Sequence, residues 1–216
     1  MKLKEVLGTK LGVSIELLVF FIIALSTVQL GIIIPLLVVL YIISIRTRQL
    51  KLIHIGFDSA DIKLKFILLG ISIAVAYHFI FNYAIEPVLD TWLPSSNLKA
   101  FGNIKGNLPQ LLILLITTWI IGAILEELLF RGYLVNRLLD LFGNSFLSKI
   151  IVIILASTAF GFVHFYQGLH GVISAIIFGI FQCILYLLNK RKLFLPMIVH
   201  GTFDTISFII LYLGIV

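Results

Sequence analysis

Long runs of apolar residues, separated by short polar connections, make up most of the chain. A helix needs about 20 apolar residues to cross the hydrocarbon core of a bilayer, within a range of roughly 17 to 25. The runs lie at 11–29, 31–46, 64–84, 109–139, 149–166, 168–189 and 193–215. The pattern therefore predicts an all-α fold, a polytopic membrane helix bundle with about seven transmembrane helices.

The first two runs are ambiguous, because Leu11 to Ile45 is too long for one ordinary span and short for two. A break near Gln29-Leu30-Gly31, with Pro35 in the first turns of the next helix, predicts a tight hairpin. Loops rich in Lys and Arg face the cytoplasm, and two helices before Arg46 bring every basic cluster to one side. These clusters are Lys2, Lys4 and Lys10; Arg46, Arg48 and Lys51; Arg137 and Lys149; and Lys190, Arg191 and Lys192. Seven spans and a cytoplasmic N-terminus are predicted.

Composition agrees with a lipid environment. Hydrophobic residues make up 61% of the 216 residues and charged residues only 12%, against roughly 25% charged residues in soluble domains. The net charge is +6, but the basic residues stand in short clusters between apolar runs, without the aromatic-basic interleaving of a nucleic-acid surface. We therefore expect contact with membrane lipids, including an anionic cytoplasmic leaflet, and no nucleic-acid partner.

The longest polar connection covers about residues 85–108. It is nearly neutral, so it suits the outer side of the membrane, and Trp92 is expected at the lipid–water interface. Its charged residues are Glu86, Asp90, Lys99 and Lys105. Repeats and soluble domains are not evident, so residues 1–216 are interpreted as one membrane domain, with N-terminal spans and an outer loop (1–108) and a four-helix core (109–216).

The fourth run contains two carboxylates and a guanidinium, in Glu126, Glu127 and Arg131. A charged residue at a helix centre costs about 2.5–3.5 kcal/mol on insertion scales, so this group needs a compensating reason such as a water-filled cavity. On an α-helix Glu127 and Arg131 form an i, i+4 pair, whereas Glu126 points about 140° away from Arg131. The spacing predicts an ion pair that leaves Glu126 less neutralised, as a general base requires. The alternative is that all three mark the cytoplasmic end of a tilted helix.

Two later runs also carry polar residues. The fifth ends in Phe160-Gly-Phe-Val-His164, where Phe160 shares a face with His164 and is expected to pack. The seventh contains His200-Gly-Thr-Phe-Asp204, another i, i+4 pair, in which a carboxylate beside an imidazole fixes its tautomer. Taken singly, each has a plain alternative: an interfacial histidine, and a self-neutralising pair between helices.

Together, Glu126-Glu127-x-x-x-Arg131, Phe160-x-x-x-His164 and His200-x-x-x-Asp204 occur in that order on three apolar segments. This pattern resembles the CAAX protease and bacteriocin-processing family (CPBP, also called Abi), which includes the type II CAAX prenyl endopeptidases. The resemblance covers about residues 109–208. The first three spans match only in hydropathy and in the short connector at residues 52–57.

The resemblance implies a role for each matched residue. Glu126 matches the glutamate that activates water, and His164 the histidine that helps to hold it. His200 and Asp204 match the pair that stabilises the oxyanion, while Glu127, Arg131 and Phe160 match supporting positions. In the eukaryotic CAAX enzymes, the position that matches Asp204 resembles Asn. An ionised aspartate cannot donate a hydrogen bond, so either His200 donates while Asp204 orients it, or Asp204 is protonated.

The predicted function is an intramembrane endopeptidase of the bacterial cytoplasmic membrane, without a cofactor. Its expected substrate is a peptide or a prenylated or otherwise membrane-bound protein, and bacteriocin immunity is a further family role. A zinc protease is an alternative, because two histidines and a carboxylate suit zinc, although the HExxH spacing is absent. A non-proteolytic immunity or scaffold protein, or a transporter, is the other alternative.

Overall fold

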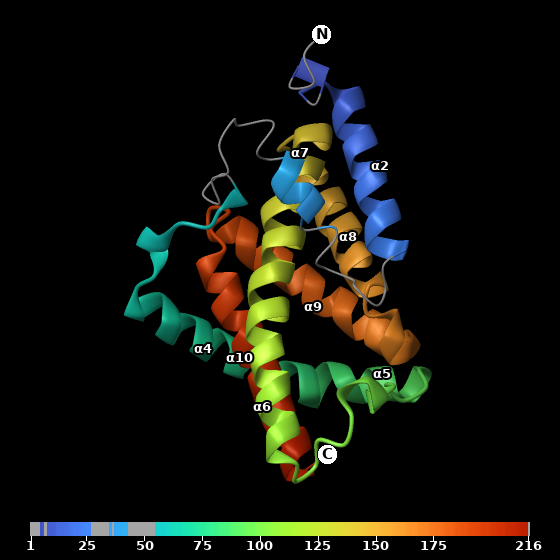
Figure 1. Cartoon of the computed structure of the whole chain (residues 1–216), viewed down its shortest axis with the longest axis vertical. Helices are drawn as coiled ribbons and strands as arrows, with labels where there is room; N and C mark the ends of the chain where they lie inside the picture. The colour runs from blue at the N-terminus through green and yellow to red at the C-terminus, as the bar shows by residue number, and fades with distance from the viewer. Residues whose placement is uncertain (1–4, 7, 27–34, 36, 43–54, 216) are drawn as a thin grey trace.

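The computed structural model of the chain describes residues 5–6, 8–26, 35, 37–42 and 55–215 (Figure 1). Within these ranges the regular elements are helices, and none is a strand. The predicted all-α membrane bundle is confirmed.

The helices follow the predicted apolar runs closely. In the N-terminal half they are α2 (Lys10–Ser26), η2 (Ser59–Asp61), α4 (Leu64–Ile80), the π-helical η3 (Phe81–Ile85), α5 (Glu86–Trp92) and η4 (Leu98–Phe101). In the C-terminal half they are α6 (Leu108–Thr117), the π-helical η5 (Thr118–Val135), α7 (Asn136–Phe142), α8 (Phe146–Phe162), η6 (Phe165–Gln167), α9 (Gly168–Leu188) and α10 (Phe194–Leu213). Pro35 and residues 37–42 are helical as well.

Within the described part of the chain, four continuous helices are long and apolar enough to cross a membrane, judged by length and composition: Leu64–Trp92, Leu108–Phe142, Phe165–Leu188 and Phe194–Leu213. Helices α2 and α8 have 17 residues each, the lower limit for a span. The predicted break near Gln29-Leu30-Gly31 lies outside the described residues, as do Lys2, Lys4, Arg46, Arg48 and Lys51. The predicted orientation in the membrane therefore stays a prediction.

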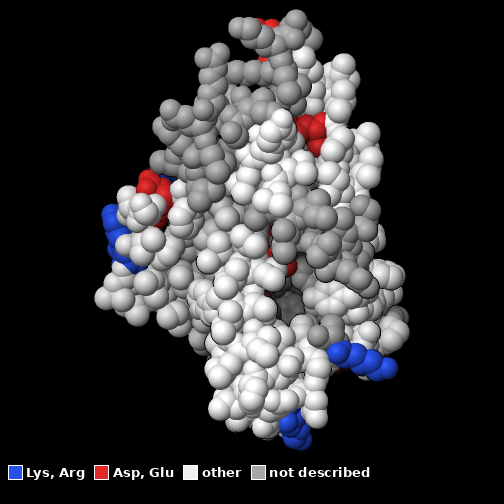
Figure 2. Space-filling view, viewed as in Figure 1, with Lys and Arg blue, Asp and Glu red and all other residues white. Residues whose placement is uncertain are grey.

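Large apolar side chains are exposed on the outer faces of these helices. Leu68 and Phe79 on α4 are 57% and 55% exposed, and Ile113 and Ile116 on α6 are 56% and 60% exposed. Among the described residues, charged side chains are sparse on the face seen in Figure 2. Soluble monomers rarely expose apolar surface so extensively, so these faces are suited to lipid.

The prediction that a polar connection starts at residue 85 is wrong for residues 86–92, which form α5 and continue the helix of α4. Pro87 lies just after the π-helical η3 inside this continuous helix, at a point where it has no N–H to donate to the preceding turn. Trp92, at the end of α5, is 83% exposed. The irregular part of the connection therefore starts only after Trp92.

The helix Leu108–Phe142 runs along the long axis of the molecule (Figure 1). Its central part, η5, contacts α8, α9 and α10, and α7 contacts α2. Buried aromatic rings hold these helices together, with Phe130 edge-on to Phe160 at 5.1 Å between ring centroids and Phe20 of α2 5.5 Å from Tyr133. The Tyr133 hydroxyl also donates to Glu16 of α2 at 2.6 Å, so a polar bond adds to the apolar contact.

The assumption of an uninterrupted α-helix through the fourth run is wrong. Residues Thr118–Val135 are π-helical, with turns closed by i→i+5 rather than i→i+4 bonds. The wider turn changes the angle between side chains, so the 140° expected between Glu126 and Arg131 does not apply. π-helical turns are uncommon and often lie at functional sites, and this one carries all three charged residues of the run.

Candidate active site

Glu127 and Arg131 are completely buried, and Arg131 Nη1 donates to Glu127 Oε1 at 3.0 Å. The predicted ion pair is therefore present. The Arg131 guanidinium also lies over the ring of Phe160, 4.4 Å from its centroid, which adds a cation–π contact to a fully buried side chain. Phe160 is 1% exposed, as its predicted packing role requires.

Glu126, next to this pair, takes a different position. Its side chain is 15% exposed and lines a cavity of about 370 Å³, whereas the Glu127 side chain has no exposed surface. The two adjacent carboxylates are thus separated into a buried structural one and one that faces the cavity, as the sequence predicts.

His164 lies two residues beyond the end of α8, not within the helix as expected. Its Nδ1 is 2.8 Å from the carbonyl oxygen of Phe160. A carbonyl only accepts, so Nδ1 carries the proton and the neutral ring presents Nε2 as an acceptor. His164 lines the same cavity as Glu126.

His200 of α10 connects the buried pair to the cavity. Its Nδ1 donates to Glu127 Oε1 at 2.8 Å, while Nε2 lies 3.5 Å from Asp204 Oδ2 and 4.0 Å from Glu126 Oε2. The sequence analysis assigns the orientation of His200 to Asp204. In the structure His200 donates its hydrogen bond to Glu127, because the packing of η5 against α10 brings these two residues together across 73 positions of sequence. Glu127 is thus bonded to both Arg131 and His200.

Asp204 receives a hydrogen bond that the sequence analysis did not anticipate. The hydroxyl of Thr118 donates to Asp204 Oδ2 at 3.2 Å. Thr118 is on the same long helix as Glu126, eight residues before it. That position in the fourth run is the sequence signal that could have identified Thr118 as part of the site. The bond leaves Asp204 in the accepting role that an ionised carboxylate requires.

The cavity brings together Glu126, His164, His200 and Asp204 from the three separate motifs. Much of its remaining lining is apolar, from Phe81, Leu98, Phe101, Phe178, Phe203 and Phe208. A hollow is visible near the middle of the face in Figure 2, with acidic side-chain atoms inside it. The cavity lined by Glu126, His164, His200 and Asp204 has a volume within the range of about 300–1,000 Å³ typical of ligand sites, and a few polar groups converge there in mostly apolar surroundings.

Among the described residues, one group of side chains has the spacing of metal ligands. Three donor atoms of His, Cys, Asp or Glu lie within 4.8 Å of one another at Glu86, Asp90 and His170. The described donors of the cavity, Glu126, His164, His200 and Asp204, do not form such a group. The sequence analysis overlooked His170, whose acidic partners lie 80 and more residues away.

Among protein families, residues 108–206 match the model described as Rce1-like, type II CAAX prenyl endopeptidase Rce1-like. The matched segment contains all three motifs, from Glu126 to Asp204. Neither the curated proteins nor the solved structures include a match to the chain.

Proposed function

We propose that the chain is a membrane peptidase of the type II CAAX prenyl endopeptidase family, whose model residues 108–206 match, and that it hydrolyses a peptide bond inside the membrane with a water activated by Glu126. The observation that supports this most strongly is that the four polar residues of three separate motifs line one cavity within an apolar helix bundle. Each would be costly in lipid without a function that requires it.

In the first step a water lies between the Glu126 carboxylate and Nε2 of His164. Both groups accept hydrogen bonds, so they orient the two O–H bonds of the water and leave an oxygen lone pair directed at the substrate. Glu126 removes one proton as the water oxygen bonds to the peptide carbonyl carbon. The bond from Nδ1 of His164 to the Phe160 carbonyl keeps the ring in the required tautomer.

In the second step the carbonyl oxygen becomes an oxyanion. His200, in its imidazolium form, donates Nε2–H to this oxygen, while Glu127 holds Nδ1–H at 2.8 Å. A preorganised donor in a low-dielectric cavity stabilises developing charge most effectively. Asp204, bonded by Thr118, lies beside Nε2 and limits the directions in which it can donate.

In the last step the tetrahedral intermediate collapses. The C–N bond breaks, and Glu126 gives its proton to the leaving amine, which restores the carboxylate. Water supplies the hydroxyl of the new acid and the hydrogen of the new amine, so no acyl-enzyme and no cofactor are needed. The fixed charges also balance closely: Arg131 and the imidazolium of His200 offset Glu127 and Asp204, which leaves one negative charge on the reacting Glu126.

The cavity lining supports a membrane-associated or lipid-modified peptide as the substrate class, since aromatic and aliphatic side chains cover much of its wall. The proposed location is the bacterial cytoplasmic membrane. A zinc protease with the metal at Glu126, His164 and His200 is the competing mechanism, and the spacing of those donor atoms does not favour it.

The test is cleavage of lipidated and unlipidated reporter peptides by the full chain in liposomes. Glu126→Gln preserves size and removes the base, and we expect a loss of about 10²–10⁴-fold, the usual contribution of general base catalysis. Glu5→Gln, the same chemical change at an exposed site before α2, is the control. Unchanged cleavage by Glu126→Gln at an unchanged melting temperature would refute the mechanism and favour a non-proteolytic membrane partner.

A further inference from the structure

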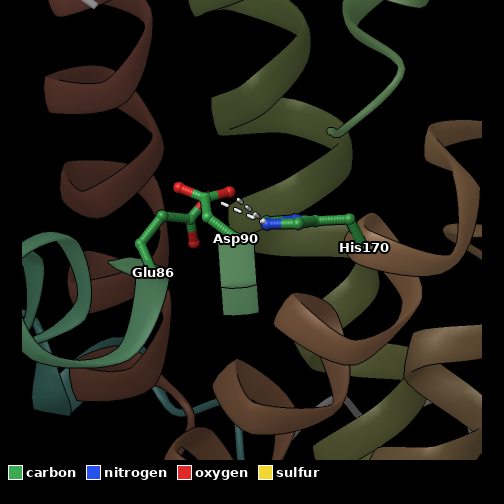
Figure 3. Close-up of side chains that lie close together, drawn as sticks. All are labelled: Glu86, Asp90 and His170. Atoms are coloured by element: carbon green, nitrogen blue, oxygen red, sulfur yellow. Dashed lines mark hydrogen bonds and ion pairs between the residues drawn. The ribbon is translucent and has the colours of Figure 1, made fainter. Parts of the chain in front are cut away.

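A second cluster of polar side chains lies between α5 and the first turn of α9, apart from the cavity residues. Glu86 and Asp90 are one helical turn apart on α5, and both carboxylates point toward the imidazole of His170 (Figure 3). His170 Nε2 lies 3.2 Å from Asp90 Oδ1 and 3.6 Å from Glu86 Oε1. None of the three residues lines the cavity that holds Glu126.

We propose that Glu86, Asp90 and His170 bind a divalent transition-metal ion, with zinc as the best match. Zinc accepts imidazole nitrogen and carboxylate oxygen at about 2.0–2.2 Å in tetrahedral geometry, which requires neighbouring donor atoms about 3.3 Å apart. The two measured separations, 3.2 and 3.6 Å, bracket that spacing. With three protein ligands, water completes the fourth position.

The histidine is held as a metal ligand would be. It is 2% exposed, and its Nδ1 is 2.8 Å from the hydroxyl of Ser96. If Nδ1–H donates to that hydroxyl, Nε2 presents a lone pair to the two carboxylates. A hydrogen bond on the far ring nitrogen fixes the tautomer and orientation of ligating histidines in the same way.

The two carboxylates, Glu86 and Asp90, also favour the binding of a cation. Among the described residues neither Glu86 nor Asp90 forms an ion pair with a lysine or arginine, and Glu86 Oε2 is buried without a hydrogen-bond partner. A lone pair on Nε2 facing two carboxylate oxygens is repulsive. A divalent ion would neutralise both negative charges and turn three competing acceptors into three ligands.

The site would act on the cavity through the chain around Ser96. The next residue, Asn97, bonds through its backbone N–H to the carbonyl of Gln167 at 2.8 Å and through its side chain to the carbonyl of Tyr166 at 3.3 Å. Leu98, which follows, lines the cavity together with Tyr166 and Gln167. A bound ion would therefore hold the part of the cavity wall formed by Leu98, Tyr166 and Gln167 in place. It would do so without contacting the reacting groups.

The experiment is zinc titration of the purified full chain in detergent, followed by calorimetry, metal analysis and thermal unfolding. Wild type should bind zinc at this site, and at free zinc about 100 times Kd the unfolding equilibrium constant should fall about 100-fold. Glu86→Gln with Asp90→Asn keeps the shapes and removes both anionic ligands, so this site should be lost. Ser96→Ala should retain the site with an affinity about 10–100-fold weaker.

Two matched variants locate the ion. His78→Gln changes another buried histidine, on α4, and should bind zinc as wild type does. Glu126→Gln should also bind normally, because Glu126 is not a ligand here. Equal zinc binding by wild type and the Glu86→Gln, Asp90→Asn variant would overturn the proposal, and so would the absence of binding by both zinc and manganese. In that case Nε2–H simply donates to Asp90.

Discussion

Replacing Gly122 by alanine tests whether the space beside His200 is used by the reaction. An added Cβ would lie 3.6 Å from His200 Nε2, 3.4 Å from Asp204 Oδ2 and 3.9 Å from Thr118 Oγ1. These are ordinary van der Waals distances, so the methyl group fits without displacing its neighbours. It would, however, occupy the side of Nε2 on which the proposed mechanism needs the oxyanion.

We expect Gly122→Ala to keep or raise the stability of the protein and to lower its cleavage activity. Alanine is favoured over glycine in a helix by about 1 kcal/mol, so the melting temperature of Gly122→Ala should be equal or higher. Loss of one oxyanion donor costs about 10²–10³ in kcat, so we expect reporter cleavage to fall about 100-fold. The assay is peptide cleavage in liposomes beside a thermal melt of the same preparation.

Gly201→Ala is the matched control, because the same substitution on α10 would bring a Cβ to 2.7 Å from the ring of Trp119. Such overpacking costs about 1–3 kcal/mol, so this variant should melt lower than wild type. Wild-type cleavage by a stable Gly122→Ala protein would refute the reasoning, since it would mean that no reacting group uses the space next to Nε2.

Three further outcomes follow from the same contacts. Glu127→Gln removes the charge that both Arg131 and His200 bind, so it should destabilise the protein by about 3–5 kcal/mol and abolish cleavage; an unchanged melting temperature would contradict the shared ion pair. Tyr133→Phe removes the 2.6 Å bond to Glu16 and should cost about 1.5–3 kcal/mol in a thermal melt, with cleavage below the transition retained. A chelator should lower the wild-type melting temperature and leave that of the Glu86→Gln, Asp90→Asn variant unchanged; a cleavage loss on chelation that persists in this variant would point to zinc in the cavity instead.

Much of the helical architecture could be predicted from the sequence, because hydropathy is a local property. The predicted run at 168–189 corresponds to α9 at Gly168–Leu188, and the run at 193–215 to α10 at Phe194–Leu213. The Glu127–Arg131 pair could be predicted for the same reason, since both partners are on one helix one turn apart. The separation of Glu126 from that pair could be predicted from side-chain angles on an α-helix, although the exact angle does not hold in the π-helical η5.

Contacts between helices could not be predicted in this way. That Glu127, rather than Asp204, orients His200 depends on how η5 packs against α10, and hydropathy gives no crossing angle or rotation. The bond from Thr118 to Asp204 joins residues 86 positions apart. The π-helical winding of Thr118–Val135 changes side-chain directions without leaving a signal in the spacing of charged residues.

The sequence by itself determined that this chain folds as a membrane helix bundle and which polar residues need a reason to be there, since burial of charge in lipid is costly wherever the helix lies. Only the tertiary structure decided which of those residues meet. It brought Glu126, His164, His200 and Asp204 to one cavity, and it joined Glu86 and Asp90 to His170 at another place. The physical reason is that hydrogen bonds and ion pairs act over about 3–4 Å, so they depend on how helices distant in sequence pack together.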